Sequence, residues 1–353
     1  MKIKLAILEK DIGYLNRIVS VFNQKYADKI QVYSFTTPEV TYKTLHDTKI
    51  DVLLASDFFD IDFSKIPSRC GFAYFVDYMD IETLNNQKTI CKFQKADLIY
   101  KQILSLYSEN AENITGLKIT DEACKLIAFT SPCGGAGSST VAAAAAMHFA
   151  AQGRKTLYLN LEKFGSSDTL FSGEGQFDFS DVIFSVKSKK SNLSMKMESC
   201  VKEDNNGVHF FSAPKQALDM LELHTEEMIR LISELELTGS YEYIVVDVDF
   251  SMDKEFLKFL KKFHSIIVTT TGTELSNNKL FRMYTALGVM EKNDDAPVLS
   301  RMAVLYNKFS NKTCKVLGDI ELKSLGGIQR FDHATDRQVV EQISKMPVLD
   351  ALV

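Results

Sequence analysis

Short apolar runs alternate with amphipathic stretches along the whole chain, at the spacings typical of strands and helices. In the first third, apolar runs predict strands at 2–8, 30–35, 51–56, 71–77 and 89–93. Stretches with apolar residues every three or four positions predict helices at 13–26, 37–47 and 95–108. Strands that alternate with helices imply a parallel, doubly wound sheet.

The same alternation of apolar runs and periodic stretches continues through the rest of the chain. Apolar runs predict strands at 125–130, 155–162, 207–214, 241–250, 264–271 and 301–309. Periodic stretches at 139–152 and 225–237 predict helices, and Gly153 is placed to end the first of them. Strands that are apolar throughout are typical of a parallel sheet buried on both faces.

A polar stretch, SENAENITG, separates the two regions. We therefore predict two α/β domains, 1–107 and 123–353, joined by a linker at 108–122. A length of 353 residues also favours two domains over one.

Charge narrows the classes of function. The net charge of −5 and a pI near 5.8 disfavour nucleic-acid binding, which needs a basic face. The one visible basic run is 186–196, and a solvated loop explains it more simply.

Cysteine usage and hydropathy indicate a cytoplasmic protein. The six cysteines are scattered, with no C-x-x-C and no spacing typical of metal ligands, so we expect reduced thiols. The N-terminal residues lack the features of a signal peptide, and the longest apolar run, 141–151, has about half the length that a bilayer span needs. The final residues, ISKMPVLDALV, contain a proline and little basic charge, so we expect no direct membrane insertion.

The first predicted domain resembles the receiver domain of response regulators. Receivers chelate Mg²⁺ with an acidic pair after the first strand, where this chain has Glu9 and Asp11. The phosphate-accepting aspartate should end the third strand, but Ser56 stands there and Asp57 follows one position later, on the opposite face. Lys92 matches the lysine that ends the fifth strand of receivers; taken alone, it is explained more simply as a surface lysine. We expect a degenerate receiver that is not phosphorylated and that serves as a docking or dimer surface; the alternative is a working receiver that uses Asp57.

The stretch SPCGGAGSST (131–140) lies between a predicted strand and a predicted helix. A glycine-rich turn in this position lets backbone N–H groups converge on one phosphate, and the helix N-terminus adds partial positive charge. The hydroxyls of Ser139 and Thr140 can ligate Mg²⁺ or cap the helix. The alternative is a purely structural glycine turn.

This loop and the motifs after it resemble the MinD/ParA family of P-loop ATPases. The loop aligns with K-G-G-x-G-K-[ST]-[ST], in which Ser139 matches the Mg²⁺-ligating hydroxyl. Glu162 takes the second position of the family's Asp-x-Asp, and Asp247 ends a strand that matches Walker B. Asn307, in VLYNKF, matches the residue that reads the adenine edge.

The resemblance implies ATP and Mg²⁺ as ligands. Glu162 would be the catalytic, water-positioning residue, and Ser139 and Asp247 would hold the metal. The nucleotide would be contacted by Cys133, Gly134, Gly135, Ala136, Gly137, Ser138, Ser139, Thr140, Asn307, Lys308 and Phe331.

The loop departs from the family at three positions. Pro132 replaces its first glycine, Cys133 replaces the lysine that reaches the partner's nucleotide, and Ser138 replaces the lysine on the β- and γ-phosphates. Backbone donors remain, so we expect ATP to bind. Because the charges that follow the transferring phosphoryl group are lost, we expect weak or absent hydrolysis.

Other interpretations of single residues remain open. Glu162 is also explained as a solvated glutamate, Asn307 as a turn cap and Phe331 as a core residue. Cys133 is either a reactive thiol or a small neutral filler.

A receiver-like domain joined to a MinD/ParA-like domain resembles the TadZ (CpaE-like) family of Tad/Flp pilus secretion systems. That resemblance implies a homodimer with bound ATP that recruits other Tad proteins to the assembly site, at a cell pole or the inner face of the membrane. Two alternatives stay open: a genuine MinD/ParA-type ATPase switch, and a ParA-like DNA partition protein, which the acidic pI disfavours.

Overall fold

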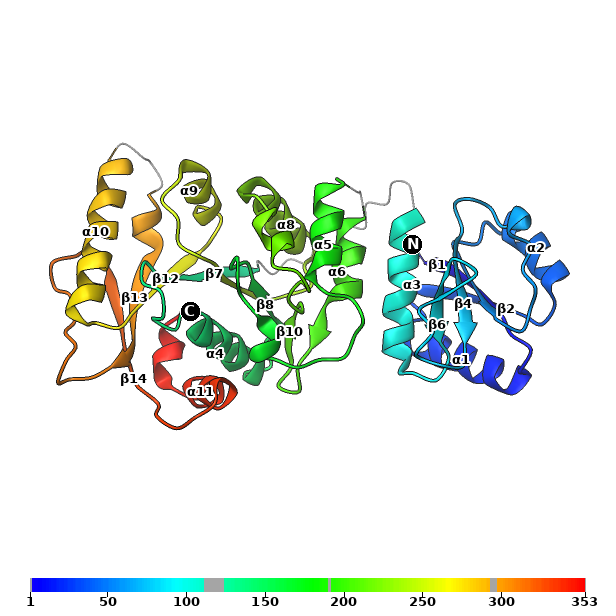
Figure 1. Ribbon diagram of the computed structural model, residues 1–353, viewed down its shortest axis with the longest axis horizontal. Coiled ribbons are helices and arrows are strands. Elements are labelled where there is room, and N and C mark those ends of the chain that lie inside the picture. Colours follow the sequence, from blue (N-terminus) through cyan, green and yellow to red (C-terminus); the bar gives the residue numbers. More distant parts are fainter. Residues whose placement is uncertain (1, 111–123, 190–191, 293–296, 353) are drawn as a thin grey trace. The chain divides into compact units, whose positions relative to one another are not determined.

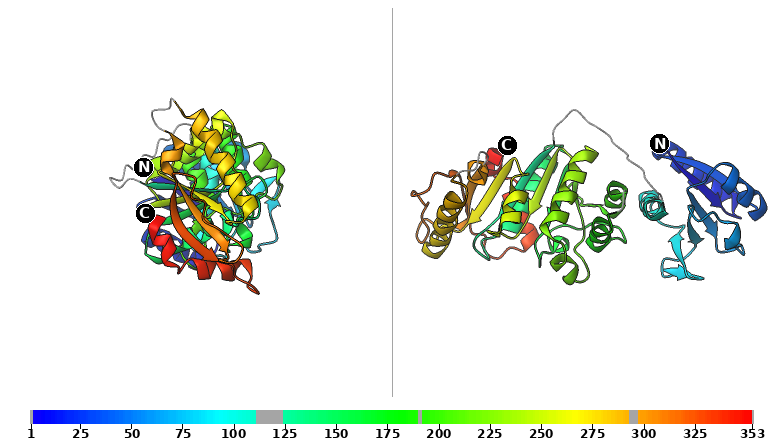
Figure 2. Two further views of the ribbon diagram at one scale, coloured as in Figure 1. Left: turned by 90° about the vertical axis from the view of Figure 1, so that its left-hand side faces the viewer. Right: turned by 90° about the horizontal axis from the view of Figure 1, so that it is seen from above.

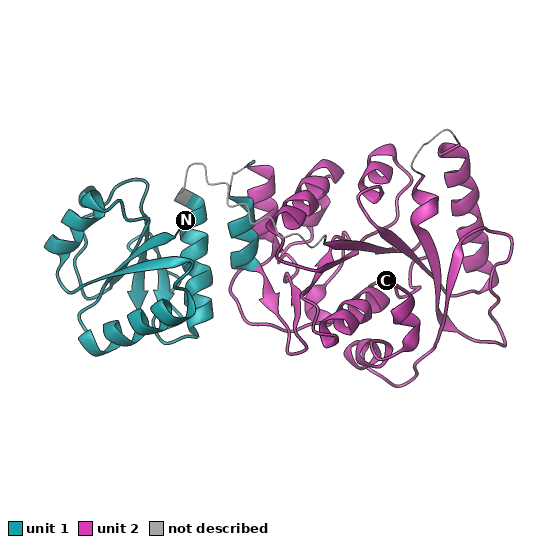
Figure 3. Cartoon of the chain, turned by 180° about the vertical axis from the view of Figure 1, so that it is seen from behind, with its two compact units in different colours: residues 1–116, 189–200 teal, residues 117–188, 201–353 magenta. Residues whose placement is uncertain are grey.

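The computed structural model describes residues 2–110, 124–189, 192–292 and 297–352 (Figure 1). Contacts within the chain define two units. Unit 1 comprises residues 1–116 and 189–200, and unit 2 comprises residues 117–188 and 201–353 (Figure 3). Each unit is built on one mostly parallel sheet, which confirms the predicted fold class.

The sheet of unit 1 has the strand order β2-β1-β3-β4-β6-β5, in which only the β5–β6 pair is antiparallel among the described strands. Its strands are β1 (Ile3–Leu8), β2 (Ile30–Phe35), β3 (Val52–Ser56), β4 (Gly71–Val76), β5 (Thr83–Leu84) and β6 (Gln87–Cys91). With β6 counted as the fifth parallel strand, this is the 2-1-3-4-5 order of receiver-type sheets.

The helices of unit 1 are α1 (Ile12–Lys25), α2 (Pro38–Asp47), η1 (Phe63–Lys65), α3 (Ala96–Asn110) and α6 (Leu193–Cys200). Helix α1 begins where the Asp11 carboxylate accepts a 3.0 Å hydrogen bond from the Tyr14 backbone N–H. Its apolar face, with Leu15, Ile18 and Phe22, is buried in a core shared with β1 and α3.

Helix α6 joins unit 1 although it lies within the second half of the chain. It packs on α3, and Figure 3 shows it in the colour of unit 1. The buried Lys196 ammonium donates to the Ser105 hydroxyl at 2.9 Å, and the Glu198 carboxylate accepts from Lys29 at 2.5 Å. The sequence predicts a solvated loop at 186–196. This is wrong for 186–187, which end α5 (Phe179–Lys187), and for 193–196, because α6 buries its lysine against polar partners on α3. Residues 190 and 191 lie outside the described residues.

The sheet of unit 2 has the order β14-β13-β12-β7-β11-β8-β10-β9, parallel except for β9–β10 among the described strands. The right-hand view of Figure 2 shows these strands from above. They are β7 (Lys125–Thr130), β8 (Thr156–Asn160), β9 (Lys202–Glu203), β10 (Val208–Phe210), β11 (Tyr243–Asp247), β12 (Ser265–Thr270), β13 (Met302–Phe309) and β14 (Lys323–Gln329).

Helices cover both faces of this sheet. Figure 1 shows α4 and α11 on one face and α8, α9 and α10 on the other. The helical elements are α4 (Ser138–Ala151), η2 (Ser167–Thr169), α5 (Phe179–Lys187), α7 (Leu218–Leu221), α8 (Thr225–Thr238), α9 (Lys254–Leu260), α10 (Glu274–Met290), η3 (Val298–Arg301), α11 (Asp336–Ile343) and η4 (Pro347–Leu352).

Helix α4 forms the centre of the unit 2 core. Its five consecutive alanines, 142–146, are completely buried, because methyl side chains let the helix lie close to the sheet on one side and to α11 on the other. Gly153 follows the helix with φ +78° and donates to the Ala150 carbonyl, which confirms the predicted stop.

The predicted linker, 108–122, falls mostly outside the described residues. Its first three residues belong to the last turn of α3, which extends to Asn110. No helix in the described part of the chain is both long and apolar enough to cross a bilayer.

Candidate nucleotide site

The glycine-rich loop joins β7 to α4 through two left-handed residues. Gly135 has φ +77° and Gly137, the N-cap of α4, has φ +85°, a conformation that side chains with a Cβ disfavour. A Cβ on Gly137 would also lie 2.4 Å from Asn307 Nδ2, so a side chain here would have to displace the Asn307 amide. The turn brings the backbone to the N-terminus of a 14-residue helix, which favours a bound anion.

The start of the loop is held against β12 and α10. The Ser131 hydroxyl lies 2.7 Å from the Thr269 carbonyl oxygen and accepts a 3.0 Å bond from the Cys133 N–H. The Cys133 sulfur is buried, 3.8 Å from the Ser276 carbonyl oxygen. Cys133 therefore fills space between elements, and this favours the interpretation as a neutral filler over a reactive thiol.

Three oxygen-bearing side chains meet beside the first turn of α4. The Ser139 hydroxyl donates a 2.9 Å bond to Glu162 Oε2. Asp247 ends β11, which pairs with β8 so that Asp247 lies opposite Asn160, two residues before Glu162. Asp247 has no exposed surface, and its Oδ1 has no hydrogen-bond partner among the described residues.

Two side chains of β8 hold the other oxygen of Asp247. Tyr158 OH donates to Oδ2 at 3.0 Å, and Asn160 Nδ2 donates to it at 3.3 Å. Burial, and next the negative charge of Glu162, raise the pKa of Asp247 well above its usual value, although Ser139 and Tyr158 act in the opposite direction. Burial and then the Asp247 charge likewise raise the pKa of Tyr158.

Tyr158 is a site residue that sequence reasoning missed. The signal was present, since Tyr158 and Asn160 are two positions apart on one strand and therefore share a face. A tyrosine in an apolar strand is, however, common enough that nothing in the sequence marked it.

Asn307 and Lys308 both contact the loop from the end of β13. The Asn307 amide donates to the Ala136 carbonyl at 2.9 Å, and the Lys308 ammonium donates to the Gly135 carbonyl at 2.9 Å. Asn307 is buried at 3% exposure, so in this structure its amide braces the loop. Its predicted contact with adenine stays a prediction.

The remaining predicted site residues divide into two groups. Gly134 is exposed on the loop, and Thr140 is half-buried in the first turn of α4. Phe331 packs against the core cluster of unit 2, in keeping with the interpretation as a core residue. The structure thus brings 133–140, Glu162, Asp247 and the pair 307–308 together and places the half-buried Phe331 against the core of unit 2.

The oxygen cluster suits a hard cation that keeps much of its water. No group of three or more His, Cys, Asp or Glu side chains is arranged for a metal among the residues that the structure describes. Mg²⁺ commonly takes one or two carboxylates and completes its shell with water and phosphate oxygens. The Ser139 hydroxyl offers such a ligand, and so does Oδ1 of Asp247, to which no described residue donates a hydrogen bond.

Unit 1 has a pocket of about 620 Å³ at the receiver position, lined by Glu9, Lys10, Asp11, Tyr14, Ser56, Asp57, Phe58, Asp77, Lys92 and Phe93. The Lys92 ammonium lies 2.8 Å from Glu9 Oε2, 3.0 Å from Asp77 Oδ1 and 3.2 Å from Ser56 Oγ. Burial acts to lower the pKa of Lys92, but bonds to the two carboxylates together raise it above its ordinary value.

As the sequence predicts, Ser56 and not an aspartate stands at the position where receivers accept phosphate. Ser56 ends β3 and is buried at 2% exposure beside Lys92, whereas Asp57 is exposed in the following turn. The buried carboxylate beside the lysine therefore comes from Glu9.

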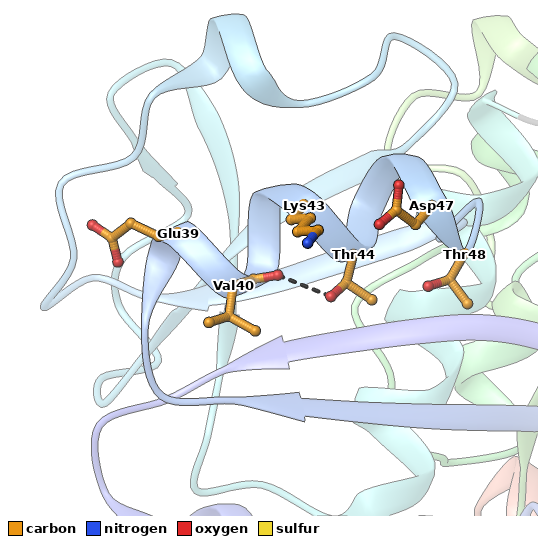
Figure 4. A pocket seen from close by; sticks show the side chains of 6 residues that line it. All are labelled: Glu39, Val40, Lys43, Thr44, Asp47 and Thr48. Atoms are coloured by element: carbon orange, nitrogen blue, oxygen red, sulfur yellow. Dashed lines mark hydrogen bonds between the residues drawn. The ribbon is translucent and has the colours of Figure 1, made fainter.

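A second hollow of about 520 Å³ lies along α2 and is lined by Glu39, Val40, Lys43, Thr44, Asp47 and Thr48 (Figure 4). All six residues come from one helix or its C-cap, and the Thr44 hydroxyl donates to the Val40 carbonyl of that helix. The hollow brings together no groups from different elements, so it is a poor candidate for chemistry.

Comparison with known proteins gives one family-model match and several matches to solved structures. Residues 1–108 match a family model described as "TadZ-like, receiver domain". No curated protein gives a significant sequence match. Among solved structures, the chain is similar to a ParA family ATPase from Chlorobium tepidum, with 20% identity and a TM-score of 0.52 over 65% of this chain and 98% of that one.

Two MinD structures are also similar. The MinD of a MinC:MinD complex from Aquifex aeolicus gives 18% identity and a TM-score of 0.49, covering 65% of this chain and 92% of that chain. The MinD of Pyrococcus horikoshii, complexed with Mg-ADP, gives 14% identity and a TM-score of 0.47, covering 63% of this chain and 94% of that chain. The fold assignment rests on the ParA family structure. The predicted architecture, a TadZ-like receiver domain followed by a MinD/ParA-type fold, is confirmed.

Proposed function

We propose that unit 2 binds ATP with Mg²⁺ and hydrolyses it slowly or not at all, and that the chain is an assembly scaffold of a Tad/Flp pilus system. The observation that carries the proposal is the buried Asp247 carboxylate, which lies beside Ser139 and a glycine-rich helix N-terminus and whose Oδ1 has no hydrogen-bond partner among the described residues. Leaving such an atom without a partner is costly unless a ligand completes it.

The phosphates would lie on the loop backbone, held by N–H groups of Gly134 to Thr140 and by the partial charge of α4. Ser139 and Asp247 would hold the metal, with Glu162 beside them. Bound Mg²⁺ would neutralise charge on the phosphate oxygens. Asn307 and Phe331 remain proposed contacts of the base.

Slow hydrolysis follows from the replaced lysines. Cys133 and Ser138 carry no charge, and a cation aimed at the transferring phosphoryl group is worth about 10³–10⁵ in rate in related NTPases. Glu162, the residue proposed to position water, already accepts a hydrogen bond from Ser139. Both features favour retention of ATP over its cleavage.

ATP held in this way would stabilise one state of the protein by mass action. In the proposed function that state is a two-fold homodimer with a nucleotide in each subunit, which presents a surface to other Tad proteins. The TadZ-like match of residues 1–108 supports this role. The proposed location is the cytoplasm, with recruitment by partners to a pole or to the inner face of the membrane.

Unit 1 would then act as a docking or dimer surface without phosphorylation. Support comes from Ser56 at the acceptor position and from the Lys92 ammonium, which is bound to Glu9 and Asp77. The proposed domains remain 1–107 and 123–353, with a linker between them.

One observation favours a second function, an ATPase switch of the MinD/ParA type. Lys308 places an ammonium on the loop and could restore part of the missing charge. Nothing in the net charge of −5 favours the third alternative, DNA partition.

Steady-state phosphate release separates the first two functions. The scaffold proposal predicts ATP binding by calorimetry with phosphate release at the background level, both alone and with candidate Tad proteins. Turnover that Asp247→Ala abolishes would establish the switch instead. Binding to plain duplex DNA that strengthens with ATP and weakens with salt would support the partition protein.

A further inference from the structure

Lys308 occupies an irregular position at the end of β13. The pairing of β13 with β14 shifts register between Tyr306 and Phe309, and Lys308 has φ +56°. A left-handed residue other than glycine is uncommon, and bulges of this kind re-aim a side chain away from the regular pleat. Here the re-aimed side chain is a lysine.

The bulge directs Lys308 onto the loop. Its ammonium lies 2.9 Å from the Gly135 carbonyl oxygen, and its Cε would lie 3.7 Å from a Cβ placed on Gly137. The preceding residue, Asn307, fixes the same segment by its 2.9 Å bond to Ala136. The stem therefore lies along the turn that would wrap a phosphate, while the side chain stays exposed to solvent.

We propose that Lys308 donates to a phosphate oxygen of a bound nucleoside triphosphate and so strengthens its retention, without replacing in hydrolysis the lysines that are absent at Cys133 and Ser138. This inference rests on the proposed nucleotide site. An ammonium has three N–H donors, and the Gly135 carbonyl takes one of them. The long flexible stem lets the group turn to a phosphate oxygen without moving the backbone.

The two possible roles of Lys308, stabilising the loop or binding phosphate, predict different effects of salt on ATP affinity when the lysine is removed. A lysine that only stabilises the loop would act through its carbonyl bond, and its loss would change affinity equally at low and high salt. A lysine that contacts phosphate adds a charge–charge interaction, so its loss lowers affinity and also flattens the dependence of affinity on salt.

The test is calorimetric titration of the full chain with ATP and Mg²⁺ at low and at high salt. The variants are Lys308→Met, Lys308→Arg, and Lys312→Met as the matched control, since Lys312 is an exposed lysine in the turn after β13. We expect Lys308→Met to weaken ATP binding about tenfold to a hundredfold at low salt and to flatten the salt dependence. Lys308→Arg and Lys312→Met should stay within about threefold of the parent chain.

A second substitution distinguishes loss of the Lys308 charge from misfolding of the Lys308→Met variant. Ser138→Lys in the Lys308→Met background returns a lysine to the loop and should recover most of the lost affinity. A parent chain that binds ATP while Lys308→Met binds it equally well, or with unchanged salt dependence, would overturn this inference and leave the nucleotide site standing. A parent chain that binds no ATP at millimolar concentration would overturn both.

Discussion

Tyr158 donates a 3.0 Å hydrogen bond to Asp247, and neither side chain has any exposed surface. The pair stands at the junction of β8 and β11, where the opposite oxygen of the carboxylate has no partner among the described residues. A buried carboxylate that is half satisfied destabilises the protein unless a cation completes it. The relationship therefore links the stability of unit 2 to its ligand.

Asp247→Asn should stabilise the ligand-free protein. The pKa of Asp247 is higher in the folded chain than in an unfolded one, so the folded state binds more protons between the two values. The stability of the ligand-free protein accordingly falls as pH rises through that window. The Asn side chain of the variant does not ionise, so this loss of stability does not occur. We expect calorimetric Tm near pH 7 to rise by about 2–4 °C, the shift for roughly 1 kcal/mol in a domain of this size.

The same variant should lose the added stability that Mg²⁺ and ATP give the parent chain, because a metal ligand must be ionised. A Tm that falls on Asp247→Asn, or one that ATP and Mg²⁺ still raise, would contradict the metal role of Asp247.

Ser139→Ala should weaken binding of ATP in the presence of Mg²⁺ by at least about tenfold and leave binding in EDTA unchanged. The hydroxyl offers a metal ligand and bonds Glu162, whereas the loop backbone does not depend on it. Titration with and without EDTA measures both effects. Ser139→Thr keeps the hydroxyl and is the control; equal losses in Ala and Thr would point to packing in the first turn of α4.

Lys92→Met should destabilise unit 1 by about 3–5 kcal/mol, because it leaves the Glu9 carboxylate buried without its 2.8 Å partner. Glu9→Gln in the same chain should recover most of this loss. Denaturant unfolding, followed as separate transitions for the two units, measures it. A double variant no more stable than Lys92→Met would show that the ion pair is not the cause.

A small-molecule phosphodonor should leave the mass of the chain unchanged. Asp57 is exposed in the turn after β3, and Ser56 holds the place beside Lys92. Ser56→Asp returns a carboxylate to that place and controls for the rest of the pocket. Intact-mass measurement decides, and a phosphoryl adduct on Asp57 of the parent chain would restore the working-receiver alternative.

Sequence patterns predicted most of the described strands because burial dominates them, but of the described α-helices they predicted only α1, α2, α3, α4 and α8. The apolar runs at 30–35 and 125–130 coincide with β2 and β7, and the Gly153 stop is confirmed. β14 (Lys323–Gln329) was missed, since KSLGGIQ is mostly polar or glycine and most of its residues are not buried. The place of α6 was missed because eight residues with weak periodicity do not reveal a partner helix.

The sequence predicted which residues form the candidate site, but it did not predict all the contacts among them. Residue types and spacing singled out Ser139, Glu162 and Asp247, and the structure brings these three together. The bond of Lys308 to Gly135 was not predictable, because it depends on a bulge between β13 and β14. Such contacts between residues far apart in sequence are set by sheet register, which no local pattern encodes.

The central claim is that ATP is held and not cut. The most direct measurement is to incubate the full chain with ATP and Mg²⁺ for hours, remove unbound nucleotide, denature the protein and separate the released nucleotides by chromatography. We predict close to one ATP per chain with little ADP, and none retained by Asp247→Ala. Recovery of ADP in place of ATP, or of no nucleotide at all, would contradict the account.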